Sequence, residues 1–318
     1  MDRSKPTLLS LTLYIGDERE SPEIQDIWNT VLASNSNRWR SLHLGIFNDR
    51  DSDTIELHPL FQAITGRLES LQHLSITAIP VEVELEPRDL FSVCPSLNSI
   101  ALECVDLDTL ALPHSQIRSL TIRYGAIDDD FATLFPNVEH IVLEDLYCPY
   151  DPSDPERQIC CSSKVRSLTV TAGRSCEEAD EIFNPFRTFT LPGLSSLGIT
   201  DSASDFLEDW KTFDEKTVEH FLIRSRCSIT HFLLKSTPIT DGQAIKVIGL
   251  MPTLQSLHIE NTIAKRIDTA REIVDTAKAF TNRVAELSEA IPPVINPISF
   301  PAHMVNATLT VISEKLGG

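Results

Sequence analysis

Residues 117–122, Ile-Arg-Ser-Leu-Thr-Ile, decide the fold because they show in its simplest form a pattern that returns along the whole chain. The pattern places apolar residues at its first, fourth and sixth positions. The last two are two residues apart, which is the spacing of side chains on one face of a β-strand. The first lies earlier and is expected to pack at the turn into that strand.

The same pattern occurs ten times between Leu8 and Ile259. Successive copies begin about 27 residues apart on average, a spacing that falls within the range of leucine-rich repeats. The first apolar residues of the copies are Leu8, Trp39, Leu71, Leu97, Ile117, Val138, Val165, Leu194, Ile229 and Leu254.

Short helical segments are expected between these strands. Residues 24–32 carry a helical stripe of apolar residues, and residues 89–93, 131–135 and 243–250 read as one or two helical turns. Prolines that cannot continue a helix follow several such segments, at Pro95, Pro136, Pro192 and Pro252.

One strand and one helix cannot bury their apolar sides alone, so such units stack into a continuous core. The sequence therefore predicts an α/β fold over residues 1–262: an irregular leucine-rich-repeat solenoid of about ten repeats. Its parallel sheet should line the concave side, with the helices outside.

The pattern stops after Thr262. Residues 263–290 carry apolar residues at three- and four-residue steps, which predicts one amphipathic helix that caps the open core. The same helix could instead bind a partner or form a coiled coil. Residues 291–318 form a C-terminal tail without a firm assignment.

Charge excludes several classes of protein. The chain has 27 basic and 46 acidic residues and a net charge of −19, which argues against nucleic acids and anionic membrane surfaces as partners. It shows no apolar run long enough for a membrane span and no apolar secretory leader. Its seven cysteines include no Cys-x-x-Cys pair, which favours reduced thiols in a cytoplasmic or nuclear protein. Cys94, in apolar surroundings, is expected to be a small core residue.

The acidic residues are unevenly distributed. Residues 81–156 hold sixteen acidic and three basic side chains. They could steer a basic protein partner towards this region, or they could only keep a repeat protein soluble.

Two stretches, residues 234–242 and 251–259, resemble the repeats of F-box leucine-rich-repeat proteins. The start is similar more narrowly to the segment that follows the F-box in fungal F-box proteins, chiefly through Arg38-Trp39-Arg40 and Leu42. Proteins of that family act as substrate receptors of Skp1–cullin ubiquitin ligases: the F-box docks on Skp1 and the repeats hold the target.

The resemblance covers the repeats alone, because only seven residues precede Leu8 and the F-box itself is absent. Binding to Skp1 is therefore expected only if a missing N-terminal F-box exists. The family places Asn or Cys in the turn after each strand. In this chain Cys104 fits, whereas the other matching positions hold Ala78, Tyr124, Ala172 and Ser236.

Residues that alternate with the buried strand positions are expected to face the concave surface and to bind a protein. The candidates there are His73, Glu103, Arg123, His140, Glu144, His231, Lys235, His258 and Glu260. A proline-rich loop at residues 147–155 adds Tyr147 and Tyr150. The many serines of this face also have a plainer explanation, since short polar side chains fit a crowded parallel sheet.

No enzymatic site is expected. The chain contains no Gly-x-Ser-x-Gly nucleophile turn, and a metal held by His43 with His73, or by His231 with His258, would need two more ligands. We therefore expect no catalytic residues, no metal and no cofactor.

The sequence thus predicts a non-enzymatic protein–protein interaction module that resembles the target-binding part of a ubiquitin-ligase substrate receptor. The alternative is a structural or self-associating repeat scaffold that has no connection with ubiquitin.

Overall fold

The computed structural model describes only part of the chain. Residues 24–29, the loop with Tyr147 and Tyr150, and the predicted helix at 263–290 lie outside the described residues. The described residues are 7–15, 30, 32–47, 54–56, 61–79, 84–86, 89–105, 107, 110–125, 131–145, 160–172, 181–201, 213–260 and 308–311. The chain divides into two compact units, residues 1–165 and residues 166–318.

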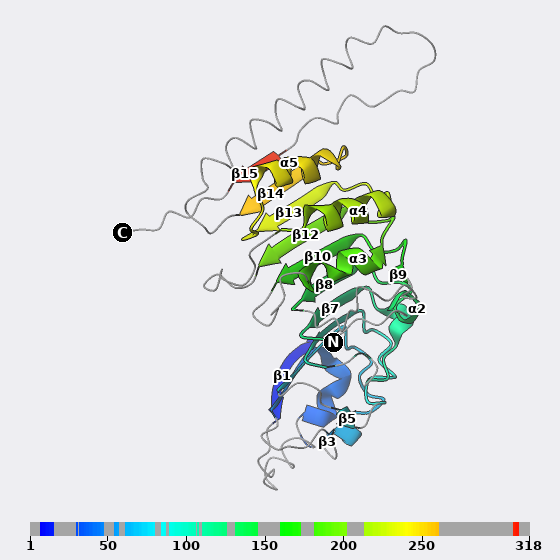
Figure 1. The fold of residues 1–318 in the computed structure, drawn as a ribbon. Coiled ribbons are helices and arrows are strands. Elements are labelled where there is room, and N and C mark those ends of the chain that lie inside the picture. Colours follow the sequence, from blue (N-terminus) through cyan, green and yellow to red (C-terminus); the bar gives the residue numbers. More distant parts are fainter. Residues whose placement is uncertain are drawn as a thin grey trace, which may run out of the picture. The chain divides into compact units, whose positions relative to one another are not determined.

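Six strands of the first unit pair in parallel, in the order in which they occur in the sequence (Figure 1). They are β1 (Leu9–Ile15), β2 (Trp39–Phe47), β4 (His73–Ile79), β6 (Ser99–Glu103), β7 (Ser119–Arg123) and β8 (His140–Glu144). Two short strands, β3 (Thr54–Glu56) and β5 (Glu84–Glu86), form a separate parallel pair. Each of the six strands carries one copy of the sequence pattern, so the prediction of these strands is confirmed.

The apolar positions of the pattern form the core. Leu42 and Leu44 of β2, and Leu120 of β7, are all 0% exposed. The first position of the pattern is buried as well, as Trp39 and Ile117 show. Burying two apolar side chains per strand on one face sets the register, because a shift by one residue would turn every side chain to the other face.

Short helices connect the strands of the first unit. They are the 3-10 helices η2 (Ala33–Arg38), η3 (Phe61–Ala63) and η5 (His114–Gln116) and the α-helix α2 (Phe131–Leu134); the short strand β9 (Cys160–Cys161) comes near the end of the unit. The prediction for residues 131–135 is confirmed, whereas that for residues 89–93 is wrong. These residues form turns, such as the 3.0 Å bond from the Ser92 N–H to the Asp89 carbonyl, and the turns already bury Leu90, Phe91 and Cys94 without a helix.

Five strands form the parallel sheet of the second unit. They are β10 (Ser167–Ala172), β12 (Ser196–Asp201), β13 (His231–Lys235), β14 (Ser256–Glu260) and β15 (Thr308–Val311). The first four carry the sequence pattern. The fifth, β15, lies in the C-terminal tail, where the pattern predicts no strand, and it pairs with β14 in parallel, with Leu309 beside Leu257.

Helices of the second unit lie on one face of its sheet (Figure 1). The connecting elements are η6 (Glu181–Phe183), α3 (Asn184–Thr188), β11 (Phe189–Thr190), α4 (Glu215–Ser225) and α5 (Asp241–Gly249). The helix predicted at residues 243–250 is confirmed as α5. The fold class is thus α/β, with large parallel sheet structure and few helices.

Several strands end in a residue with left-handed backbone geometry. The φ angles are 56° at Cys104, 50° at Tyr124, 53° at Asp145 and 55° at Ser236. Each comes directly after a strand, whereas Ala78 lies inside β4 and Ala172 is the last residue of β10. The Cys104 N–H donates to the Arg123 carbonyl at 3.0 Å and the Ser236 N–H to the Glu260 carbonyl at 2.8 Å, so the turn continues the hydrogen bonding to the next strand.

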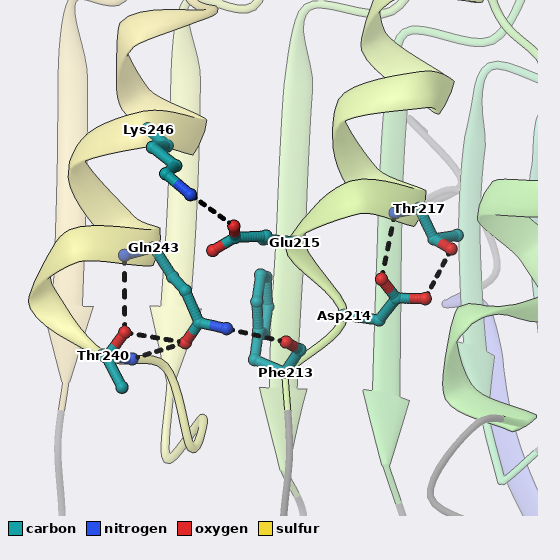
Figure 2. Close-up of polar contacts among 7 residues, drawn as sticks. All are labelled: Phe213, Asp214, Glu215, Thr217, Thr240, Gln243 and Lys246. Carbon is teal, nitrogen blue, oxygen red and sulfur yellow. Dashed lines mark hydrogen bonds and ion pairs between the residues drawn. The ribbon is translucent and has the colours of Figure 1, made fainter.

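Polar contacts join the starts of α4 and α5 (Figure 2). At α5, Thr240 and Gln243 form a reciprocal capping box. The Gln243 side-chain amide also donates to the Phe213 carbonyl at 3.0 Å, just before α4 begins. Lys246 Nζ lies 2.6 Å from Glu215 Oε1. Two separate contacts, from Gln243 to Phe213 and from Lys246 to Glu215, therefore join the two helix starts.

The Asp214 carboxylate caps α4. It accepts hydrogen bonds from the Thr217 backbone N–H at 3.2 Å and the Thr217 hydroxyl at 2.5 Å, and it lies 3.5 Å from Arg187 Nη2 (Figure 2 shows the Thr217 contacts). Burial raises the pKa of this carboxyl, but the hydrogen bonds from Thr217 and the charge of Arg187 lower it more, so the pKa of Asp214 lies below its ordinary value.

We expect the Asp214→Ala substitution to lower the free energy of unfolding by about 1 kcal/mol at neutral pH, because the cap of α4 is lost. Since the folded-state pKa is depressed, the stabilisation by Asp214 is complete above about pH 4 and is lost as the pH falls through the folded-state pKa. Urea unfolding of both proteins at several pH values measures the difference. The difference in free energy of unfolding should become smaller below about pH 4. The Asp214→Asn variant keeps a capping oxygen and should lose less stability than Asp214→Ala. A difference that does not change with pH would contradict this.

Candidate functional site

Side chains that alternate with the buried positions form three aligned rows across the strands of each unit. We call them together the exposed strand face. In the first unit, the first row is Ser10, Ser41, His73, Ser99, Ser119 and His140, and the third row is Tyr14, Gly45, Thr77, Glu103, Arg123 and Glu144. In the second unit, these rows are Ser167, Ser196, His231 and Ser256, and Thr171, Thr200, Lys235 and Glu260. The middle rows lie between them, for example His43, Ser75 and Thr121, and in the second unit Leu233 and His258.

Three candidate residues of the first unit come together in the third row. Arg123 Nε lies 2.7 Å from Glu144 Oε2, and Arg123 Nη1 lies 3.8 Å from Glu103 Oε2. The Thr77 hydroxyl donates to Glu103 Oε2 at 3.2 Å, which extends the chain of polar contacts to β4. The Arg123 side chain is 46% exposed, so these ion pairs contribute little to stability and remain accessible to a partner.

Carboxylates outnumber cations at this end of the strands. Burial and the negative charges of Asp145, Glu144 and Glu103 together raise the pKa of the Tyr124 hydroxyl. Arg123 is the cation that contacts two of these carboxylates. The third row of the first unit therefore ends in a region of negative potential.

Three candidate residues of the second unit also come together. Lys235 Nζ lies 3.1 Å from Glu260 Oε1, and His258 Nε2 lies 3.7 Å from Glu260 Oε2. Beside them the hydroxyls of Thr171 and Thr200 share a hydrogen bond of 2.8 Å. The group offers hydrogen-bond donors and acceptors on four neighbouring strands.

The first-row histidines remain separate from one another. His73 and His140 are exposed, and two serine-bearing strands lie between them. His231 is exposed too, and its Nδ1 atom lies 2.8 Å from the hydroxyl of the neighbouring Thr230. These histidines supply isolated polar contacts, and the candidates Tyr147 and Tyr150 lie outside the described residues.

An aromatic cluster at one end of the face was missed by the sequence prediction. The Tyr14 ring lies edge-on to His43, with centroids 6.2 Å apart, and 5.8 Å from the Phe47 ring. Tyr14 is 69% exposed and Phe47 is 41% exposed. His43 Nδ1 lies 2.9 Å from the Ser75 hydroxyl. Large aromatic side chains with a polar end are the residue type that contributes most to protein interfaces.

Gly45 makes room for this cluster. A Cβ atom on Gly45 would lie 2.5 Å from Tyr14 Cδ1, so any larger residue would displace the ring. The predicted strand pattern ended at Leu44, but β2 continues to Phe47, with Ile46 buried on the core side. The alternation of His43, Gly45 and Phe47 with Leu44 and Ile46 is the signal that could have shown the cluster.

The buried thiol of Cys94 is unsuited to nucleophilic chemistry. Cys94 is 1% exposed, as predicted for a core residue, and burial raises the pKa of its thiol to about 12. Burial also raises the pKa of the Cys104 and Cys227 thiols.

Neither a metal cluster nor a membrane-spanning helix occurs among the described residues. Within those ranges, no three side chains of the His, Cys, Asp and Glu types lie close enough to hold a metal ion. None of the helices found there is both long and apolar enough to cross a membrane.

The exposed strand face is thus an array of hydroxyl, imidazole and charged groups with one aromatic cluster. Its geometry offers hydrogen bonds, ion pairs and aromatic contacts to another molecule. When the chain is compared with models of known protein families and with curated proteins, neither comparison gives a match.

Proposed function

We propose that the chain is a non-enzymatic leucine-rich-repeat module that binds a protein on its exposed strand face. The single observation that carries this proposal is the alignment of outward side chains in three rows across successive parallel strands. Parallel repeats that each add one strand build an extended binding surface of this kind.

Three features support the leucine-rich-repeat solenoid as the finer architecture. The apolar pattern recurs in every long strand of both sheets except β15, and its last two apolar positions pair with each other from strand to strand. Strands that follow one another in the sequence lie side by side. Left-handed residues recur at the same turn position after four strands. In this proposal the helix at 263–290 closes the last repeat.

A protein carrying basic surface is the partner that suits the face best. Small side chains on open strands form no deep apolar pocket of the kind small molecules require. The carboxylates around Tyr124 and the net charge of −19 favour a cationic partner over nucleic acid or an anionic membrane. We place the protein in the cytoplasm or nucleus.

The resemblance to fungal F-box proteins makes target binding for a ubiquitin ligase the more specific form of this proposal. The repeats would hold the target, and contact with Skp1 would require an F-box in addition to these repeats.

Site-specific photo-crosslinking tests the binding face. A photoreactive amino acid replaces Thr121, in the middle row of β7, or Ser115, an exposed residue in η5. The full-length proteins are irradiated in a cell extract and the crosslinked proteins are identified by mass spectrometry. The proposal expects a discrete partner from position 121 and not from position 115. Equal labelling from both positions would contradict it.

The identified partner then allows a quantitative measurement. Tyr14→Ser combined with Phe47→Ser should weaken binding by about tenfold or more, because buried aromatic anchors dominate interface energies. Val93→Ser is the matched control, since Val93 is an exposed apolar residue away from the strands. Affinity should also fall from low to high salt if charge steers the partner. If the double substitution left the affinity unchanged, the assignment of the binding face would be overturned. If salt left the affinity unchanged, the assignment of a basic partner would be overturned.

A further inference from the structure

Strand β1 ends the sheet of the first unit. It pairs with β2 on one side, and none of the strands in the described ranges pairs with its other side. Arg38 holds the start of β1 in place: its Nη2 and Nε atoms donate to the Thr7 carbonyl at 2.8 and 3.2 Å. The strand is therefore a fixed edge.

The backbone groups that face this edge can be identified from the other strands. Residues of the first row donate their N–H to the preceding strand in each described case: Ser99 to Gln72, Ser119 to Asn98 and His140 to Arg118. Because hydrogen-bonding direction alternates along a strand, the N–H and C=O groups of Ser10, Thr12 and Tyr14 point away from β2.

The core face of β1 is incompletely covered. Leu8 is 44% exposed, whereas Trp39, its equivalent in the next copy of the pattern, is 0% exposed. Leu11 and Leu13 are half-buried, whereas Leu42 and Leu44 beside them are 0% exposed. A further strand beside β1 could therefore bury the exposed apolar area of Leu8, Leu11 and Leu13.

We propose that this edge pairs with β1 of a second copy of the chain. The two strands run antiparallel around a two-fold axis at Thr12. Thr12 then faces Thr12 of the second copy, Ser10 faces Tyr14, Leu11 faces Leu13 and Leu9 faces Ile15. This register uses every residue of β1.

The strand is complementary to itself in three ways. In this register the three outward-bonding residues face one another, so each forms a hydrogen-bonded pair. Leu11 and Leu13 meet on the core side. The sequence of β1, LSLTLYI, contains no charge, Gly or Pro, which are the residues that usually protect an edge from pairing.

A two-fold pairing also closes the assembly, because both copies use the same edge. In the second unit β14 is paired on both sides, with β13 and with β15, so β14 is not an edge strand. The pairing is made by backbone groups of β1, but Ser10 and Tyr14 also belong to the exposed strand face, so the dimer interface adjoins the proposed binding surface at this strand.

Light scattering coupled to gel filtration of the full chain, over a dilution series, tests the pairing. We expect a species of twice the 35.5 kDa of one chain that dissociates on dilution. A monomer at every concentration would overturn the proposal. Thr12→Pro removes an edge-facing N–H from each copy, spares the bonds to β2, and should raise the dimer dissociation constant about 10- to 100-fold. Thr12→Val keeps the N–H and should remain a dimer.

A dimer that survives Thr12→Pro with unchanged affinity would place the contact elsewhere. Circular dichroism shows whether the proline variant is folded, and crosslinking provides a test that does not depend on it. In the proposed register, the Cα atoms of position 12 lie about 5.5 Å apart, within reach of a disulfide. Thr12→Cys should therefore form a covalent dimer when diamide is added as oxidant, whereas Ser10→Cys, which faces Tyr14, should not. Equal crosslinking at both positions, or none at position 12, would overturn the register.

Discussion

Replacing Trp39 with alanine is expected to lower the free energy of unfolding of the first unit by about 3–5 kcal/mol. Trp39 begins β2 and is 0% exposed. Removing its ring leaves a cavity among closely packed neighbours, and the loss is a large part of the 5–15 kcal/mol that stabilises an ordinary domain. Urea unfolding followed by hydrogen exchange of residues in β2 and β4 measures the effect.

Arg40→Ala is the control for Trp39, because it changes the same Arg-Trp-Arg segment on its exposed side. Arg40 is exposed and donates to Gln72 Oε1 at 3.0 Å, so its loss should change stability by about 0.5 kcal/mol or less. Similar effects of the two substitutions would show that the segment is not anchored by its tryptophan. The expected contrast gives this segment a structural role, whatever partner the chain binds.

Replacing Arg224 with alanine is expected to cost the second unit about 2–4 kcal/mol. From α4, the Arg224 Nη2 atom donates to the carbonyls of Phe186 and Phe189 at 2.7 and 2.6 Å, and Nε donates to the Thr190 hydroxyl at 3.1 Å. Partial burial lowers the pKa of this guanidinium, which nonetheless stays charged at neutral pH. Alanine would leave the two carbonyls at the end of α3 without their charged donor.

Arg224→Lys separates geometry from charge. Lysine keeps the positive charge but cannot bind both carbonyls and the hydroxyl with one planar group. We therefore expect the free energy of unfolding of the lysine variant to lie between those of the wild type and the alanine variant. Thermal and urea unfolding of the three proteins provide the comparison. If lysine restored full stability, the charge alone would explain the role of Arg224, and if alanine cost nothing, the three hydrogen bonds would be unimportant.

The strands could be predicted from the sequence because the pattern has a direct physical cause. Residues such as Leu42 and Leu44 must lie on one side of a strand and must be buried. The spacing of apolar residues therefore indicates both the strand and its buried face. The helices were harder to predict. α5 has a capping box and was expected, but α4 follows residues without the pattern. At residues 89–93 a turn buries Leu90 and Phe91, so their apolar character did not require a helix.

The candidate site was predictable where the register alone decides contacts. Arg123 and Glu144 occupy the same row of adjacent strands, so their pairing follows from the alignment of the copies. The aromatic cluster depends on the length of β2 beyond the pattern and on the space above Gly45, neither of which the pattern contains. The turn position after each strand was visible from the spacing, but its left-handed geometry was not, because Cys104, Tyr124 and Ser236 are not residue types that favour that geometry, whereas Asp145 is.

These turns have a consequence for the stability of the chain. Side chains with a Cβ atom in the left-handed region cost on the order of 1–2 kcal/mol each compared with glycine, yet the chain accepts Cys, Tyr, Asp and Ser there. The turn position after these strands therefore carries different side chains at a cost in stability. Two of these side chains, Tyr124 and Asp145, lie beside the charged end of the third row. Substitution of any one of these turn residues by glycine would therefore recover stability.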